Sequence, residues 1–138
     1  MYIDIAGADE YLTSRHLDLS SWTALSTMEK TVLLNQAFDI IESQIYSGYP
    51  LYDNAFPRYI PYGVEMIGVP DEIGYAQAEL AFSLISLDDT QTRQLQGVSS
   101  YSIGHLSETL KGNMNEVKIV SPKAYNILKK YQGAVRII

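Results

Sequence analysis

The sequence predicts a mainly α fold: a small bundle of about four helices with one β-hairpin and an extended C-terminal tail. Three observations lead to this prediction. Apolar residues recur at spacings of three and four in several segments. Asp, Ser or Pro stands where each of these segments would begin a helix. One later segment instead carries a Gly-x pair between apolar residues, which is typical of a hairpin.

The first helix is expected over residues 5–16. Asp4 precedes it and can accept a hydrogen bond from the unpaired backbone amides of the first turn. The next segment, 17–25, contains Trp22, the only tryptophan, which we expect to anchor the turn in the core. The inner side of the helix expected over 5–16 carries Ile5, Ala8, Tyr11 and Leu12.

The second helix, over residues 27–46, has the clearest signal. Ser26 and Glu29 have the spacing of a capping box, in which each side chain binds the other residue's backbone amide. A single apolar stripe follows, so one side of this helix should be buried. The stripe consists of Leu33, Leu34, Ala37, Ile40, Ile41 and Ile45.

Residues 47–69 should form no long regular element, because prolines and glycines interrupt them throughout. A connection of this length is usually functional or disordered, and its many aromatic residues argue against disorder. Two interpretations stay open. The segment is either a lid over the core or, in part, a surface for a partner.

A third helix should begin at residues 69–72, where Pro70 suits the first turn and the acids Asp71 and Glu72 suit the positive end of the helix dipole. It should end near Ser86. Small residues on it permit close helix approach. The buried stripe is Ile73, Ala76, Leu80, Ala81, Leu84 and Ile85.

Residues 98–111 favour the β-hairpin. Its two-residue connection is Gly104-His105, and the apolar contacts come from Tyr101, Ile103 and Leu106. A lone hairpin is marginal in water, so this one should pack against the rest of the chain.

Ser121-Pro122 repeats the cap-and-proline signature and predicts a last helix to about Gln132, with Ala124, Ile127, Leu128 and Tyr131 inward. We therefore expect one helical domain over 1–132 and a tail over 133–138. The tail is β-prone, so it can add to a neighbour's sheet edge. It can equally pair back onto the hairpin or fray, and both readings stay open.

Composition argues against several classes of function. The absence of cysteine excludes disulfides, thiolate metal sites and a cysteine nucleophile. The net charge is −6 and the ten basic residues are spread along the chain, so no basic groove for nucleic acid is expected. The acidic N-terminus and the shortness of every apolar run argue against secretion and membrane insertion.

Reactive groups are scarce. His16 and His105 are the only histidines, and neither has a metal-ligand partner at helical spacing. We expect surface or turn histidines, no metal, no cofactor and no enzymatic activity. The spacing of Gly63 and Gly68 resembles a phosphate loop, but the required Lys and Ser or Thr are missing. Only a pocket with His16 or His105 beside a carboxylate would revive an enzymatic function.

The order of several motifs resembles a family of tailed-phage and prophage proteins known as "DnaT-like single-stranded DNA binding". That family is similar to the head–tail connector (head-completion adaptor) proteins of long-tailed phages. The resemblance extends from Tyr2 to about Tyr131. The motifs, in order, are residues 8–12, Trp22, the helix from Glu29 to Ser43, residues 55–58, residues 69–73, residues 76–81 and residues 102–107.

The resemblance implies a virion structural protein of the phage neck, made in the host bacterial cytoplasm. It would form a ring of about twelve copies under the portal protein and bind a stopper or tail-completion protein on its other side. DNA would pass through without specific binding, and acidic residues would suit the channel because they repel phosphate. No membrane partner is implied.

Two site assignments follow from the resemblance. The portal-binding tail would be Gly133, Ala134, Val135, Arg136, Ile137 and Ile138. The subunit interface loop would contain Tyr49, Tyr52, Phe56, Arg58, Tyr59 and Tyr62. His105 stands where the family commonly has an acid, so the charge of the hairpin turn is not inferred.

Two alternatives remain. One is single-stranded DNA binding, which needs a basic groove interleaved with exposed aromatic residues. The other is a stopper or tail-completion subunit of the neck.

Overall fold

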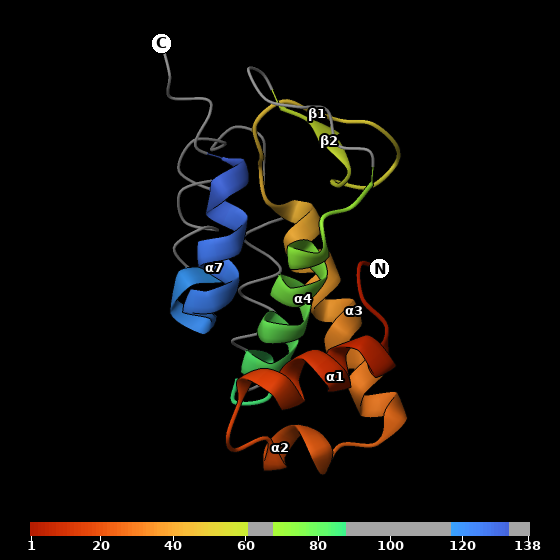
Figure 1. Cartoon of the computed structure of the whole chain (residues 1–138), viewed down its shortest axis with the longest axis vertical. Coiled ribbons are helices and arrows are strands. Elements are labelled where there is room, and N and C mark those ends of the chain that lie inside the picture. The colour runs from red at the N-terminus through yellow and green to blue at the C-terminus, as the bar shows by residue number, and fades with distance from the viewer. Residues whose placement is uncertain (61–67, 88–116, 133–138) are drawn as a thin grey trace.

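The computed structural model describes residues 1–60, 68–87 and 117–132. In these residues the fold is mostly helical with one small antiparallel hairpin, as expected (Figure 1). None of the helices in these ranges is long and apolar enough to span a membrane. The elements are α1 (Ile5–Arg15), α2 (Ser20–Thr23), α3 (Thr27–Ser43), β1 (Tyr49–Pro50), β2 (Arg58–Tyr59), α4 (Asp71–Leu84), α7 (Pro122–Leu128) and the 3-10 helix η2 (Lys129–Tyr131).

Helix α4 is the centre of the bundle. It packs against α3, α7 and α1, which cover it from different sides (Figure 1). Nine of its fourteen residues are buried, including polar Gln77 and Glu79. A helix that is buried on most of its circumference must satisfy its polar side chains inside the protein. The contacts of Gln77 and Glu79 are therefore central to the fold.

The predicted helix starts are confirmed. The Asp4 side chain accepts a hydrogen bond from the Gly7 amide at 2.7 Å, and Ser26 with Glu29 forms both bonds of the capping box. The Ser121 hydroxyl likewise accepts from the Ala124 amide at the start of α7. Each cap satisfies amides that the first helical turn leaves unpaired, which is why these starts can be recognised locally.

The predicted end of the second helix is wrong by three residues. Helix α3 ends at Ser43, because Gln44 adopts an extended backbone and its side chain binds the Ile40 carbonyl at 3.0 Å. Ile45, which the stripe placed in the core, is consequently 48% exposed. The chain then turns so that Tyr46 and Ser47 are buried instead.

The N-terminal segment lies directly on α4. A Cβ at Gly74 would come within 2.8 Å of the Tyr2 carbonyl oxygen, so the contact requires glycine. Buried Gln77 accepts from the Tyr2 amide at 3.0 Å and donates to the Leu34 carbonyl at 2.9 Å. Gln77 thereby joins the N-terminal segment, α3 and α4, and the close neighbour of Gly74 is this segment rather than the helix that the sequence predicted.

The hairpin of the structure lies within residues 47–69, where the sequence predicted no long regular element, and its strands are two residues each. Strands β1 and β2 pair with Tyr49 opposite Tyr59, after Gly48 at φ +77°. A Cβ at Gly48 would collide with the Tyr59 carbonyl, so only glycine fits this turn. The hairpin predicted over 98–111, with Tyr101, Ile103, Gly104, His105 and Leu106, falls outside the described residues.

Candidate functional site

The aromatic loop, residues 49–62, contains the subunit interface residues named above and divides into a buried and an exposed part. Phe56 is 1% exposed and Arg58 is 6% exposed, so both lie inside the chain. Tyr49 and Tyr52 are 58% and 73% exposed. Tyr59 is half-buried. Thus part of the loop packs on the core, while its exposed tyrosines are available to a partner. Tyr62 and the tail 133–138 fall outside the described residues.

Arg58 holds the loop in shape. Its guanidinium donates hydrogen bonds to the carbonyls of Ser47 at 2.9 Å, Ala55 at 3.0 Å, Tyr46 at 3.2 Å and Gly48 at 3.3 Å. Burial lowers the pKa of Arg58, although this shift leaves a guanidinium charged. Because four carbonyls converge on one side chain, Arg58 fixes the position from which Tyr49 and Tyr52 project.

A second exposed apolar surface lies at the start of α3. Met28 is 77% exposed and Val32 is 48% exposed. They border a groove of about 400 Å³ between α3 and the end of α4, whose apolar lining also includes Leu25, Leu33, Leu84 and Leu87. The sequence contained a signal for it, since Leu25, Met28 and Val32 repeat at helical spacing outside the predicted stripe.

These two surfaces are far apart. Helix α3 begins beside α2 at one end of the molecule and leads to the β-hairpin at the other end (Figure 1). The groove surface, with Met28 and Val32, therefore lies at one end. The hairpin surface, with Tyr49 and Tyr52, lies at the other.

Three tyrosine–glutamate pairs join the helices. The Tyr2 hydroxyl donates to Glu42, the Tyr11 hydroxyl to Glu79 at 2.9 Å, and the Tyr131 hydroxyl to Glu72. Burial and then the hydrogen bond to the carboxylate raise the pKa of each tyrosine. Burial opposes ionisation of Glu72, but hydrogen bonds from Tyr131 and Lys130 outweigh it and lower the pKa of Glu72. The abundance of tyrosine is thus partly structural.

His16 lies beside a buried carboxylate. It stands at the C-terminal end of α1, with its ring 4.7 Å from that of Phe82 and its Nε2 2.9 Å from Glu79 Oε1. The His16 side chain is 18% exposed and that of Glu79 only 3%. Glu79 also accepts from Tyr11, so it ties α1 to α4. This pairing spans 63 residues, and no local pattern in the sequence could have revealed it.

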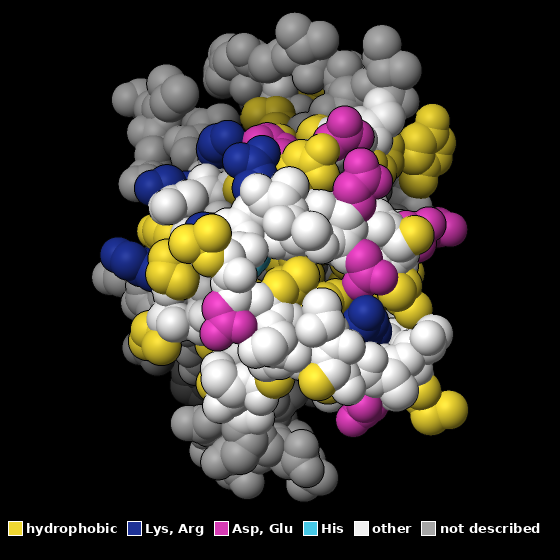
Figure 2. Space-filling model, turned by 60° about the horizontal axis from the view of Figure 1, so that its bottom comes forward, with side chains coloured by type: hydrophobic (Ala, Val, Ile, Leu, Met, Phe, Trp, Pro, Cys, Tyr) yellow, Lys and Arg dark blue, Asp and Glu magenta, His cyan; other side chains and the backbone are white. Residues whose placement is uncertain are grey.

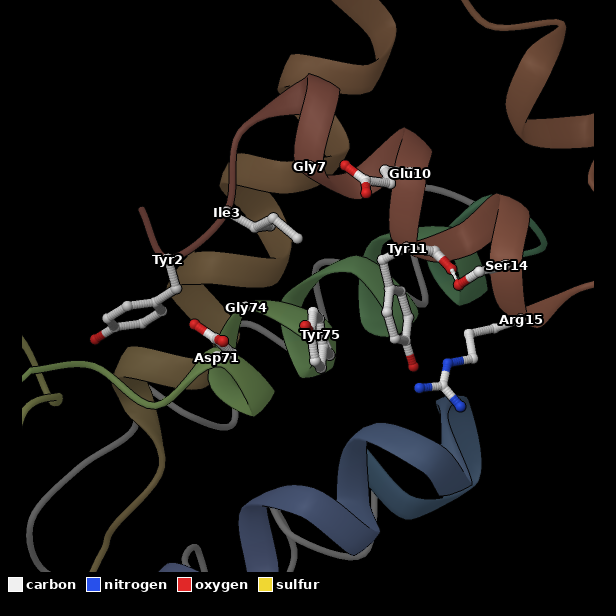
Figure 3. A pocket seen from close by; sticks show the side chains of 10 residues that line it. All are labelled: Tyr2, Ile3, Gly7, Glu10, Tyr11, Ser14, Arg15, Asp71, Gly74 and Tyr75. Carbon is white, nitrogen blue, oxygen red and sulfur yellow. Dashed lines mark hydrogen bonds between the residues drawn. The ribbon is translucent and has the colours of Figure 1, made fainter.

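A cavity of about 410 Å³ opens between α1 and the first turns of α4 (Figure 3). Tyr11 and Tyr75 stack in it with ring centroids 4.5 Å apart, and Arg15 extends from α1 toward α7. The carboxylates of Glu10 and Asp71 also line the cavity. Two carboxylates and the guanidinium of Arg15 thus line the cavity, so charges of both signs face it. His16 lines neither this cavity nor the α3 groove, so its pairing with Glu79 provides no reactive pocket there.

The basic residues are less dispersed than the sequence suggested. Figure 2 shows most of the visible Lys and Arg side chains gathered on one side of the molecule, with the acids mainly on the other. Residues 117–132 contain four lysines and no acid. We call these the lysine face: Lys118, Lys123, Lys129 and Lys130, all exposed. The sequence feature that could have predicted this face is the absence of acids from residues 117–132, because the lysines themselves are not densely spaced.

Within the part of the chain that the structure describes, no three His, Asp or Glu side chains are placed to hold a metal ion.

The comparisons with known proteins give one match. The model of a family described as "Putative DnaT-like ssDNA binding protein" matches residues 1–137. Neither the curated proteins nor the solved structures contain a match. Because the family model covers nearly the whole chain, this protein belongs to that DnaT-like single-stranded DNA-binding protein family.

Proposed function

We propose that the chain is a head–tail connector subunit of a phage neck, and that it acts by binding other proteins rather than by catalysis. About twelve copies would form a ring under the portal protein, matching the closed symmetry of such assemblies. The other face of the ring would receive a stopper or tail-completion protein. The motif order resembles the DnaT-like family, and the similarity of that family to connector proteins supports this proposal.

The observation that carries the proposal is the pair of exposed apolar surfaces at opposite ends of the chain. A ring needs a head-to-tail contact, in which one surface of a subunit meets a different surface of the next. The groove surface at Met28 and Val32 and the hairpin surface at Tyr49 and Tyr52 provide two such surfaces. Exposed apolar side chains that cluster in this way are typical of protein interfaces.

The remaining assignments belong to the same proposal. Residues 133–138 would contact the portal, and DNA would pass through the ring without sequence-specific binding. The protein would be made in the bacterial cytoplasm and would end in the neck of the virion. Among the described members of the subunit interface loop, Tyr49, Tyr52 and Tyr59 are the candidates for contact, because Phe56 and Arg58 are buried.

Met28→Asp tests the groove surface. The side chain is 77% exposed, so the free energy of unfolding should change by no more than about 0.5 kcal/mol. Ring formation should nevertheless be lost, because a carboxylate would have to be desolvated in the contact. The measurement is electron microscopy of the variant co-expressed with its cognate portal protein.

Thr13→Asp is the matched control, since it places the same carboxylate on an exposed position of α1. It should assemble like the unmodified chain. Normal rings from Met28→Asp would remove the groove from the interface. Purified virions that lack the chain altogether would refute the connector proposal.

Single-stranded DNA binding is the second candidate, favoured by the family description and by the lysine face. A gel shift with oligothymidylate and with duplex of equal length, at physiological salt, separates the two candidates. Tight, salt-sensitive binding that prefers the single strand would favour this function over the connector. Binding that is weak and indifferent to strand state would favour the connector.

A further inference from the structure

The lysine face is a charged surface whose four side chains stay exposed in the packing of the described residues. Residues 117–132 carry four lysines and no acid, whereas residues 68–87 carry three acids and no basic residue. Because α7 packs on α4, the two segments lie side by side (Figure 1). The acids of this helix pair therefore lie in the α4 segment and the lysines in the α7 segment, and all four lysines are exposed to solvent.

Two lysines of the face are bound to α4 but remain accessible. Lys130 lies 3.0 Å from Glu72, and Lys123 lies 3.9 Å from Glu79. Their side chains are 59% and 52% exposed, so both side chains remain accessible from solvent. The acid partners of this face thus come from α4, and none comes from its own stretch of chain.

The other two lysines flank a tyrosine. The ammonium groups of Lys118 and Lys129 lie 5.5 Å and 5.4 Å from the centre of the Tyr125 ring. These distances are those of cation–π contacts, which hold each ammonium group close to the same ring. Because two cations already lie over the ring, Tyr125 positions charge rather than offering a free face on which a base could stack.

We propose that the lysine face contacts the phosphates of DNA without reading their sequence. Lysine is a point charge and lacks the bidentate fork of arginine, so it suits contacts to the backbone better than base recognition. The inference rests on the proposed function in one respect, since both candidate functions bring the chain close to DNA. It adds which surface meets the phosphates and by which chemistry.

The expected binding is weak and strongly dependent on salt. Each phosphate neutralised contributes about −0.7 to the slope of log affinity against log salt for a single strand, and about −0.9 for a duplex. Two to four contacts therefore predict a slope between about −1.4 and −3.6. The net charge of −6 works against binding, so contact should be detectable mainly at low salt.

The test is fluorescence anisotropy with the full chain, using labelled oligothymidylate and a duplex of equal length over a series of salt concentrations. Lys118→Gln/Lys129→Gln should weaken binding at low salt about tenfold and reduce the slope by about 1.4 on the single strand. The matched control is Asn35→Asp/Asn54→Asp, which lowers the net charge by the same amount at two exposed positions outside the face. The control should lose much less affinity.

Equal losses from both double variants would overturn the inference, because net charge alone would then explain them. Failure of the unmodified chain to bind either DNA at low salt would also overturn it, and binding to polyglutamate would then assign the face to an acidic protein. Ring assembly of Lys118→Gln/Lys129→Gln with the portal is scored in parallel. Normal rings with unchanged DNA binding would reject this inference and leave the connector proposal standing.

Discussion

Replacing Arg58 by alanine should lower the free energy of unfolding by about 2–5 kcal/mol, because two buried carbonyls lose a charged hydrogen-bond donor. Its guanidinium satisfies the carbonyls of Ser47, Ala55, Tyr46 and Gly48, and the side chain is 6% exposed. Removing it takes this donor from the two buried carbonyls, those of Ser47 and Tyr46, each of which costs about 1–3 kcal/mol. Urea denaturation measures the change, with the fluorescence of buried Trp22 as the signal.

Two further variants separate the carbonyl network from a general effect of charge. Arg58→Lys keeps the positive charge but cannot reach four carbonyls, so it should recover only a minor part of the loss. Arg15→Ala removes an exposed arginine above Tyr11 and should change stability by about 0.5 kcal/mol or less. A loss below about 1 kcal/mol for Arg58→Ala would mean that Arg58 does not hold the loop. Presentation of Tyr49 and Tyr52 would then need another explanation.

Raising the pH above 10 should destabilise the chain steeply. Burial raises the pKa of Tyr2, Tyr11, Tyr46 and Tyr131. In Tyr2, Tyr11 and Tyr131 the hydroxyl also donates a hydrogen bond to a glutamate carboxylate, which raises the pKa further. In the unfolded chain these tyrosines ionise near pH 10. Because the pKa of each tyrosine is higher in the folded chain, its contribution to the free energy of unfolding is fully present below pH 10. That contribution is lost as the pH rises toward and through the folded-state pKa.

For each tyrosine the free energy of unfolding can fall by up to about 1.4 kcal/mol per pH unit above pH 10. The loss is smaller for Tyr2 and Tyr11, because their side chains stay partly solvated. Urea denaturation at pH 8, 9, 10 and 11 measures the profile, and absorbance at 295 nm reports tyrosinate in the native state. Tyr131→Phe should reduce the slope above pH 10 by the share of one tyrosine. A slope as steep as that of the unmodified chain would show that the Tyr131–Glu72 pair is not coupled to folding.

Much of the candidate site depended on contacts that no local pattern encodes. The aromatic loop could be recognised as a mixture of packing and surface residues, but its division depended on Arg58, which binds the carbonyl of Ser47 before β1 and that of Ala55 between the two strands. The lysine face was invisible as a cluster because Lys118 and Lys129 are eleven positions apart and meet only over the Tyr125 ring. Glu79 was expected simply as part of a helix, yet it binds two residues of the α1 region.

The sequence by itself determined where α1, α3, α4 and α7 begin, but not α2, which has no side-chain cap and lies in a segment expected to be a turn. Caps such as Asp4, Ser26 and Ser121 act within three residues, and the apolar stripes follow from the helical period, so both are local properties. Only the tertiary structure decided where α3 ends, that a hairpin forms around Arg58, and which charges lie together. Those features depend on partners far away in the chain, whose positions are set by how α1, α3 and α7 pack on α4.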